Sequence, residues 1–474
     1  MRQVQLRTGT GQIPPFDFLA DEGLQVRPNT ISMAMEEGRD GKVVLPLVKV
    51  GSEEQYLLSD QALHAYRRLI QLYRGDPLRT ETPWFYLNVE TEAPKRFYVK
   101  AMQVVYPNSR EGSPLLRSGM ANVEVELIIH YAGENESATS VSVGTMSAKG
   151  SKATLASGYG SILNRIKKCT IVSAGDSEFE NLASWKFWLG IRPEYLGFAN
   201  FSPEWDLPYN GSGTETADAS AIGGQYLLFN LASSPSYALR TYSYLTDITA
   251  YGRQWTGSYR LLLRQRLSAA DMAVSIQARY GYKNGNINIP GPLTSLSSGA
   301  SGGTNWNLVD LGQVTIAPGD FRGMVSANPQ TPPDLDTAVG RFKVEIWAEL
   351  TSGSGNLHLD ALYLVPDTNM IVVEGAQLKG GEGALVINTF EDDTIACISN
   401  FPSDPYALGE VWVDTSIDRE PKAWGLPPEG GMLVFIGQST RAGATAYHND
   451  SSNITQNHTL TLDVIERWLS YSGA

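Results

Sequence analysis

The chain has 474 residues, more than one hydrophobic core usually supports, so we expect two or three domains. Lys and Arg number 37 against 50 Asp and Glu, and the resulting net charge of -13 argues against DNA or an anionic membrane as the main partner. A hydrophobic content of 42% excludes a disordered chain, and two cysteines exclude a disulfide framework.

The beginning of the sequence carries no apolar segment of the kind found in signal peptides. Nowhere along the chain is an apolar run long enough to span a bilayer. We therefore expect a protein that is made in the cytoplasm without its own export signal and that does not insert into a membrane.

The first block, residues 1–173, has the pattern of a β domain. Val125, Leu127 and Ile129 alternate with Glu124 and its neighbours, which is the period of a half-buried strand. Strands are expected at 43–50, 84–92, 97–106 and 121–131.

One amphipathic helix is expected in this block, at about residues 60–74. Leu63, Tyr66 and Ile70 recur at spacings of three and four, and Gly75 followed by Asp and Pro ends the pattern. A helix with one apolar stripe is expected to lie on the sheet that the strands form.

The second block, residues 174–368, is expected to contain only strands and turns. Short alternating segments are separated by Gly- and Ser-rich connections. In 341–350, for example, Val344 and Ile346 face one way while Glu345, Trp347 and Glu349 face the other. Strands at this spacing without a helical pattern predict a two-sheet β-sandwich or jelly roll.

The third block, residues 369–474, again predicts strands, and it either stands alone or completes the sheet of the first block. The closing segment at 459–471 alternates apolar and polar residues. The other strands are expected at 370–374, 384–388, 409–414 and 432–436.

The sequence offers no convincing catalytic constellation. Its five histidines are scattered without a metal-binding spacing, and the Gly-x-Ser-x-Gly match at 299–303 lies in a Ser/Gly-rich run without the strand and helix that a nucleophile elbow needs. Glu345 with Glu349, and the acidic run 391–393, are the remaining acid pairs. We interpret them as a solvated strand face and an acidic turn, and we expect no catalytic residues and no enzyme activity.

Tryptophans raise the question of sugar binding, because an exposed indole ring can stack on the apolar face of a sugar. Core or interface packing is the alternative for each of them, and Trp185 is the one that we expect in the core. The residues put forward for carbohydrate contact are Trp188, Trp205 and Trp255.

The second block resembles the jelly-roll carbohydrate-binding modules. The string Gly-Asp-Ser-Glu-Phe-Glu at 175–180, followed by Trp185, is similar to their opening strand, and Leu-His-Leu-Asp-Ala-Leu-Tyr-Leu at 357–364 is similar to their last. The resemblance implies an inserted, galactose-binding-like jelly roll. It also implies a structural Ca2+ held by Glu180 and Asp360, and no other cofactor.

The flanking blocks resemble phage tail proteins of the distal-tail type. The helix at 61–75 is followed by Trp-Phe-Tyr-Leu-Asn-Val-Glu at 84–90, then by Arg-Phe-Tyr-Val-Lys at 96–100, and Gly-Glu-Val-Trp-Val-Asp at 409–414 fits the same style. The resemblance implies a tail-type β domain that assembles into a ring.

Two hypotheses follow. The first is a structural virion protein of a phage tail (distal tail or baseplate-like), assembled in the host cytoplasm into a ring or tube with copies of itself and other tail proteins, with its jelly roll turned outward to a host-surface glycan or a tail protein. The alternative is a freestanding carbohydrate-binding protein without catalysis. Neither reading involves direct recognition of nucleic acid.

Overall fold

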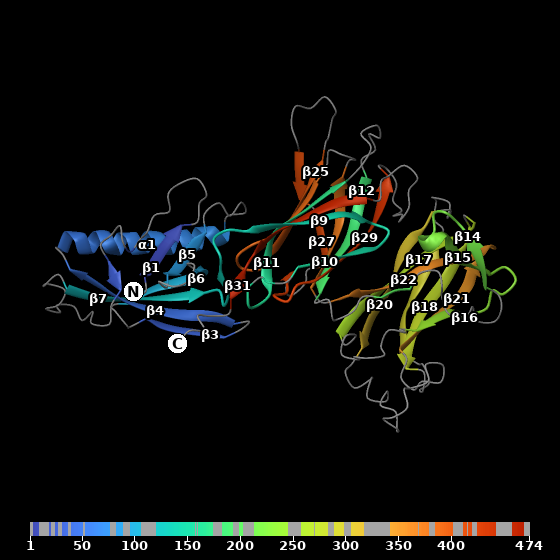
Figure 1. The fold of residues 1–474 in the computed structure, drawn as a ribbon, viewed down its shortest axis with the longest axis horizontal. Coiled ribbons are helices and arrows are strands. Elements are labelled where there is room, and N and C mark those ends of the chain that lie inside the picture. The colour runs from blue at the N-terminus through green and yellow to red at the C-terminus, as the bar shows by residue number, and fades with distance from the viewer. Residues whose placement is uncertain are drawn as a thin grey trace, which may run out of the picture.

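The protein is mainly β, as the sequence predicts, with one α-helix and strands arranged in several sheets. The computed structural model describes residues 3–8, 19, 24–26, 31–36, 39–50, 53–75, 82–88, 95–105, 120–156, 158, 160–173, 183–192, 199–201, 213–244, 257–269, 271–282, 289–297, 305–316, 342–367, 369–378, 384–401, 411–414, 416–419, 424–441 and 457–468. Within these residues the sheets form three parts that follow one another along the long axis of the molecule (Figure 1).

The N-terminal domain is a nine-stranded sheet with one long helix, α1 (Glu53–Gly75), on one face (Figure 1). Leu63, Tyr66 and Ile70 of α1 are buried against the sheet, as their spacing predicts. The strands are β1 (Gln3–Thr8), β2 (Gln25–Val26), β3 (Ser32–Glu36), β4 (Arg39–Val50), β5 (Pro83–Asn88), β6 (Lys95–Val105), β7 (Met120–Ile129), β8 (Gly133–Glu134) and β31 (Arg467–Trp468).

The helix begins earlier than the expected residue 60, at Glu53. Ser59 and Asp60, residue types that favour a helix cap, lie inside α1, because a cap contributes only about 1 kcal/mol. Extending a formed helix adds one hydrogen bond per residue, so a residue of this type does not by itself fix where the helix begins.

The central sandwich consists of a seven-stranded and a five-stranded sheet. Trp185 lies in the core between them and is fully buried, as expected. The seven-stranded sheet holds β9 (Thr139–Ser147), β11 (Asn164–Ser173), β24 (Ala384–Thr389), β25 (Ile395–Phe401), β26 (Val411–Asp414), β28 (Gly425–Leu426) and β30 (Asn457–Ile465). The five-stranded sheet holds β10 (Ser151–Leu155), β12 (Ala183–Arg192), β23 (Met370–Leu378), β27 (Ser416–Arg419) and β29 (Gly431–Arg441).

The inserted sandwich, residues 199–367, leaves the central sandwich after β12 and returns at β23, two strands that pair with each other. Its six-stranded sheet holds β13 (Ala199–Phe201), β14 (Gly213–Ala217), β15 (Gln225–Asn230), β17 (Gly257–Leu267), β20 (Asn307–Ile316) and β22 (Asn356–Pro366). Its four-stranded sheet holds β16 (Ala238–Tyr244), β18 (Ala273–Tyr282), β19 (Ile289–Ser297) and β21 (Phe342–Ser352), and a short 3-10 helix covers Ile222–Gly224.

The sheet pairings divide the chain at other positions than 173/174 and 368/369. Strand β12, from the expected second block, lies between β23 and β29 of the third. Strand β11, from the first block, lies between β24 and β30 of the third. Strand β31 pairs with β8 in the N-terminal sheet, so the end of the third block reaches the first domain.

The four sheets of the two sandwiches stack as layers. One apolar cluster lies between the two sheets of the central sandwich, and another lies between the two sheets of the inserted sandwich. A third joins the sandwiches: Trp188, Met370 and Val434 of the five-stranded sheet contact Leu262 and Tyr363 of the six-stranded one. The four-stranded sheet is therefore the layer farthest from the central sandwich.

Candidate functional site

The outer face of the four-stranded sheet carries a group of polar and aromatic side chains, which we call the aromatic face. Alternation on β21 and β18 points Val344, Ile346 and Ile276 into the core, so the residues between them point outward. Strand register then places outward residues side by side in two rows. The first row is Leu239, Trp347, Gln277 and Leu293, and the second is Tyr242, Glu345, Arg279 and Pro290.

Two aromatic rings and a guanidinium group form the centre of this face. The rings of Tyr237 and Trp347 stack with centroids 5.5 Å apart and planes 28° apart. The Arg279 guanidinium carbon lies 4.4 Å from the centre of the Trp347 ring and 5.6 Å from that of Tyr237. A guanidinium over an aromatic ring is attracted by the ring's quadrupole, and this contact adds to the stacking.

Hydrogen bonds hold these groups in place. The Tyr237 hydroxyl donates to Gln277 Oε1 at 2.5 Å, and Gln277 Nε2 donates to the Gly291 carbonyl at 2.8 Å. The Trp347 indole N–H donates to Glu345 Oε2 at 2.9 Å. The side chains of Tyr237, Trp347 and Arg279 are partly exposed, and Leu293 beside them is 60% exposed.

This arrangement is chemically suited to a polar ligand with an apolar face. A sugar ring offers C–H groups that pack on an aromatic side chain and hydroxyl groups that bond to carboxylate, amide and guanidinium groups. The positive charge of Arg279 on this face is balanced by the negative charges of Glu345 and Glu349. Glu349 pairs with Ser275 and lies on the same face. A phosphate-rich ligand needs a net basic surface, which this face does not provide.

Trp188, put forward for sugar contact, lies in the interface between the two sandwiches. It is 5% exposed and belongs to the cluster that joins them. A ring covered in this way offers no open face to a sugar. Trp205 and Trp255 lie outside the described residues.

Asp360, put forward as a Ca2+ ligand, is fully buried and forms an ion pair with Arg264, which is also fully buried. Its two carboxylate oxygens lie 3.1 and 3.2 Å from the Ile222 backbone N–H, which donates to them. A guanidinium group thus stands where the ion would have to bind, and the described surroundings of Asp360 do not fit a calcium site. The other expected ligand, Glu180, lies outside the described residues.

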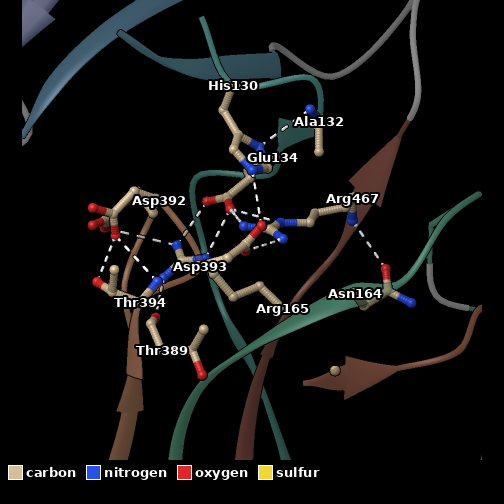
Figure 2. A network of polar contacts seen from close by, with 12 residues as sticks. His130, Ala132, Glu134, Asn164, Arg165, Thr389, Asp392, Asp393, Thr394 and Arg467 are labelled. Carbon is tan, nitrogen blue, oxygen red and sulfur yellow. Dashed lines mark hydrogen bonds and ion pairs between the residues drawn. The ribbon is translucent and has the colours of Figure 1, made fainter. Parts of the chain in front are cut away.

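The acidic run 391–393 belongs to a network of charged groups between the N-terminal domain and the central sandwich, which we call the ionic joint (Figure 2). Glu134 accepts two hydrogen bonds from Arg165, at 2.8 and 2.7 Å, and one from Arg467, at 2.9 Å. Arg467 also donates to Asp393 at 2.6 Å. These contacts connect β8 and β31 of the N-terminal sheet to β11 and the β24–β25 turn.

His130 in this joint lies beside Asp393 but is not placed as a catalytic base. Its Nε2 is 2.9 Å from Asp393 Oδ2, and its Nδ1 accepts a hydrogen bond from the Ala132 N–H at 3.2 Å. Both ring nitrogens are therefore engaged by the protein, and the side chain is only 2% exposed. A general base needs a nitrogen within reach of substrate, so we interpret the contact as structural.

In the described part of the chain, no cluster of three or more His, Cys, Asp and Glu side chains is arranged to hold a metal ion. No helix in that part has the length and apolar character needed to cross a membrane.

The sequence contained part of the signal for the aromatic face. Alternation in 341–350 placed Trp347 on one side with Glu345 and Glu349, and that signal is local to one strand. Tyr237 and Arg279 come from other segments, and they meet Trp347 only because β16 and β18 both pair with β21. Sheet order of this kind cannot be read from alternation.

Comparisons with known proteins give no relatives in sequence: no protein-family model and no curated protein matches the chain. Among solved structures, the CBM22-1 xylan-binding domain of Xyn10C from Paenibacillus barcinonensis is 13% identical with a TM-score of 0.22, over 42% of this chain and 99% of that one. The CBM22-1-CBM22-2 tandem domain of the same protein is 8% identical with a TM-score of 0.21, over 66% of this chain and 100% of that one.

A virus structure, that of the infectious bursal disease virus Gx strain, is 9% identical with a TM-score of 0.18, over 70% of this chain and 81% of that one. Likenesses at these identities and TM-scores assign neither a family nor a function to the chain.

Proposed function

We propose that this chain is a non-catalytic structural protein of a phage tail, of the distal-tail or baseplate kind. In this role the N-terminal domain assembles with copies of itself and with other tail proteins in a ring or tube. The central sandwich carries the inserted sandwich away from that assembly, toward the host surface or another tail protein.

The observation that supports this role is that the parts of the chain are held together at two joints of different chemistry. At one end of the central sandwich lies the ionic joint, in which Glu134, Arg165 and Arg467 are each at most 3% exposed. At the other end lies the apolar cluster around Trp188 and Tyr363. A spacer that transmits position from one end to the other requires fixed joints of this kind, whereas flexibly linked binding modules do not.

Electron microscopy of the purified full chain, and of tailed particles from its source, tests the proposal. We expect closed rings or tubes, or density at a tail tip into which the three-part molecule fits. Monomers at all accessible concentrations, with no matching density on any particle, would overturn the tail role.

The aromatic face supports a second function, carbohydrate contact by the inserted sandwich. It lies on the layer farthest from the central sandwich, and Tyr237, Trp347 and Arg279 are partly exposed there. Within a tail protein this contact would serve attachment to a host glycan. In a freestanding protein it would be the whole function.

Substitution of one ring tests this contact. We expect the full chain to bind at least one glycan of a cell-wall and capsule polysaccharide array, and Trp347→Ala to weaken that binding by about 1–3 kcal/mol, the range for bases stacked on aromatic side chains. Trp468→Ala removes a partly exposed tryptophan of the N-terminal sheet and serves as the matched control. Equal binding by both variants would reject the aromatic face as the contact site.

A further inference from the structure

A buried arginine is hydrogen-bonded to the backbone that carries the aromatic face. Arg240 is 1% exposed, and it stands in β16 where the register with β21 shifts between Leu239 and Thr241. The register shift identifies it as the extra residue of a β-bulge, and bulges redirect side chains. Here the side chain runs back toward the segment that precedes β16.

The guanidinium group connects two stretches of backbone. Its Nη2 lies 2.9 Å from the Ser234 carbonyl oxygen, 2.7 Å from that of Ser236 and 2.9 Å from that of Ala348. Its Nε also donates to the Ala348 carbonyl, at 3.0 Å. Ser236 directly precedes Tyr237, and Ala348 directly follows Trp347, so the two connected stretches are those that carry the stacked rings.

Burial of this charge is costly, because the acceptors described around it are neutral. Buried arginines usually pair with a carboxylate, as Arg165 does with Glu134 in this protein. Arg240 instead donates to carbonyl oxygens and, at 3.4 Å, to the Ser234 hydroxyl. Loss of hydration lowers the pKa of Arg240, which reflects the same cost. Core packing alone would be served better by an apolar side chain at this position.

We propose that Arg240 is a positioning residue for the aromatic face: by fixing segment 234–236 against β21, it holds the Tyr237 ring on the Trp347 ring before a ligand arrives. The inference rests on the proposed carbohydrate contact. Groups that are already in place do not lose conformational freedom on binding, and preorganisation of this kind raises affinity without adding a contact.

We call the hydrogen bonds of Arg240 to segment 234–236 and to Ala348 the tether. Arg240→Lys tests the tether, because an ammonium group keeps the charge but cannot bridge the same carbonyls with a planar fork. We expect glycan affinity to fall about tenfold while thermal unfolding stays cooperative. The Leu350 amide reports on the tether directly, since its N–H donates to the Pro235 carbonyl at 2.9 Å. Its hydrogen exchange should accelerate in Arg240→Lys.

Two further variants complete the experiment. Thr241→Val changes the next residue, which is also fully buried and whose hydroxyl has no hydrogen-bond partner in the described structure, so it should leave affinity and Leu350 exchange unchanged. Pro235→Gly loosens the same segment with Arg240 intact, and it should reproduce both effects of Arg240→Lys. If Arg240→Lys does not fold, Pro235→Gly still tests the proposal.

The outcomes separate the two claims. If the wild type binds a glycan, and both Arg240→Lys and Pro235→Gly bind it with the affinity of the wild type, then Arg240 is structural only and the inference is overturned. If the wild type binds no glycan, the carbohydrate function fails instead. Hydrogen exchange at the Leu350 amide then tests the tether alone. An exchange rate unchanged from the wild type in both Arg240→Lys and Pro235→Gly overturns the tether.

Discussion

His458 is an unusual residue in the core of the central sandwich. It is fully buried, and neither ring nitrogen has a hydrogen-bond partner in the described structure. The ring stands perpendicular to that of Trp185 at a centroid distance of 4.6 Å, and the Phe187 and Phe435 rings lie 5.3 and 5.6 Å away. Burial among these rings lowers the pKa of His458 to about 3, from an ordinary value of 6.5.

This shift makes stability depend on pH. The unfolded chain takes up a proton at His458 near pH 6.5, whereas the folded chain takes it up only near pH 3. Between these values the unfolded state binds more protons, so the free energy of unfolding falls as the pH falls. The slope due to this residue approaches about 1.4 kcal/mol per pH unit.

His458→Leu should remove this contribution. We expect a flatter dependence of unfolding free energy between pH 6.5 and pH 3, and at neutral pH equal or greater stability, because two unpaired buried nitrogens are gone. Urea titrations followed by tryptophan fluorescence across this pH range measure both effects. His64→Leu, at an exposed position of α1, is the control, and parallel slopes in wild type and His458→Leu would contradict the prediction.

At the scale of elements, alternation predicted strands well because it is set by neighbours in the chain. The segment 341–350 turned Val344 and Ile346 into the core, and the one strongly periodic helical segment became α1. Pairing between strands depends on residues far apart in sequence. For this reason alternation does not predict the place of β12 beside β23 and β29, although the resemblance to carbohydrate-binding modules implies an inserted jelly roll.

The aromatic face illustrates the same limit for a site. Alternation predicts the strand face of Trp347, whereas the tryptophan put forward for sugar contact is Trp188, whose spacing gives no sign that another layer covers it. No sequence pattern marks Arg240, because its role depends on a bulge in β16 and on contacts of its side chain with the Ser234 and Ser236 carbonyls. Asp360 matches a family pattern, yet its partner is Arg264, which lies 96 residues earlier in the chain on the neighbouring strand β17.

At the scale of the whole molecule, the two joints differ in how they respond to solution conditions. The apolar joint depends on buried area, which changes little with pH. In the ionic joint burial works to raise the pKa of Glu134, but the guanidinium groups of Arg165 and Arg467 outweigh it and hold this pKa at about 2, below its ordinary 4.5. The stabilisation from Glu134 is thus present above pH 4.5 and is lost as the pH falls toward 2.

Arg467→Met should loosen the ionic joint selectively. The substitution removes one of the two guanidinium groups that donate to Glu134, and it deprives Asp393 of a guanidinium at 2.6 Å. Removing one partner of a buried ion pair costs about 3–5 kcal/mol, because the remaining charge stays buried. We expect faster hydrogen exchange at β8 and β31 and a larger maximum dimension in small-angle X-ray scattering, while the inserted sandwich keeps its protection.

The control for this variant is an ion pair on the surface of the same domain. Lys42→Met breaks a 3.0 Å contact with Glu126 in which the lysine side chain is 56% exposed. Surface pairs contribute about 0–1 kcal/mol, so this variant should leave exchange and scattering unchanged. If Arg467→Met behaves like Lys42→Met, the ionic joint does not fix the N-terminal domain. A spacer role would then depend on the apolar joint alone. The N-terminal domain and the aromatic face would no longer be held in a fixed position relative to each other.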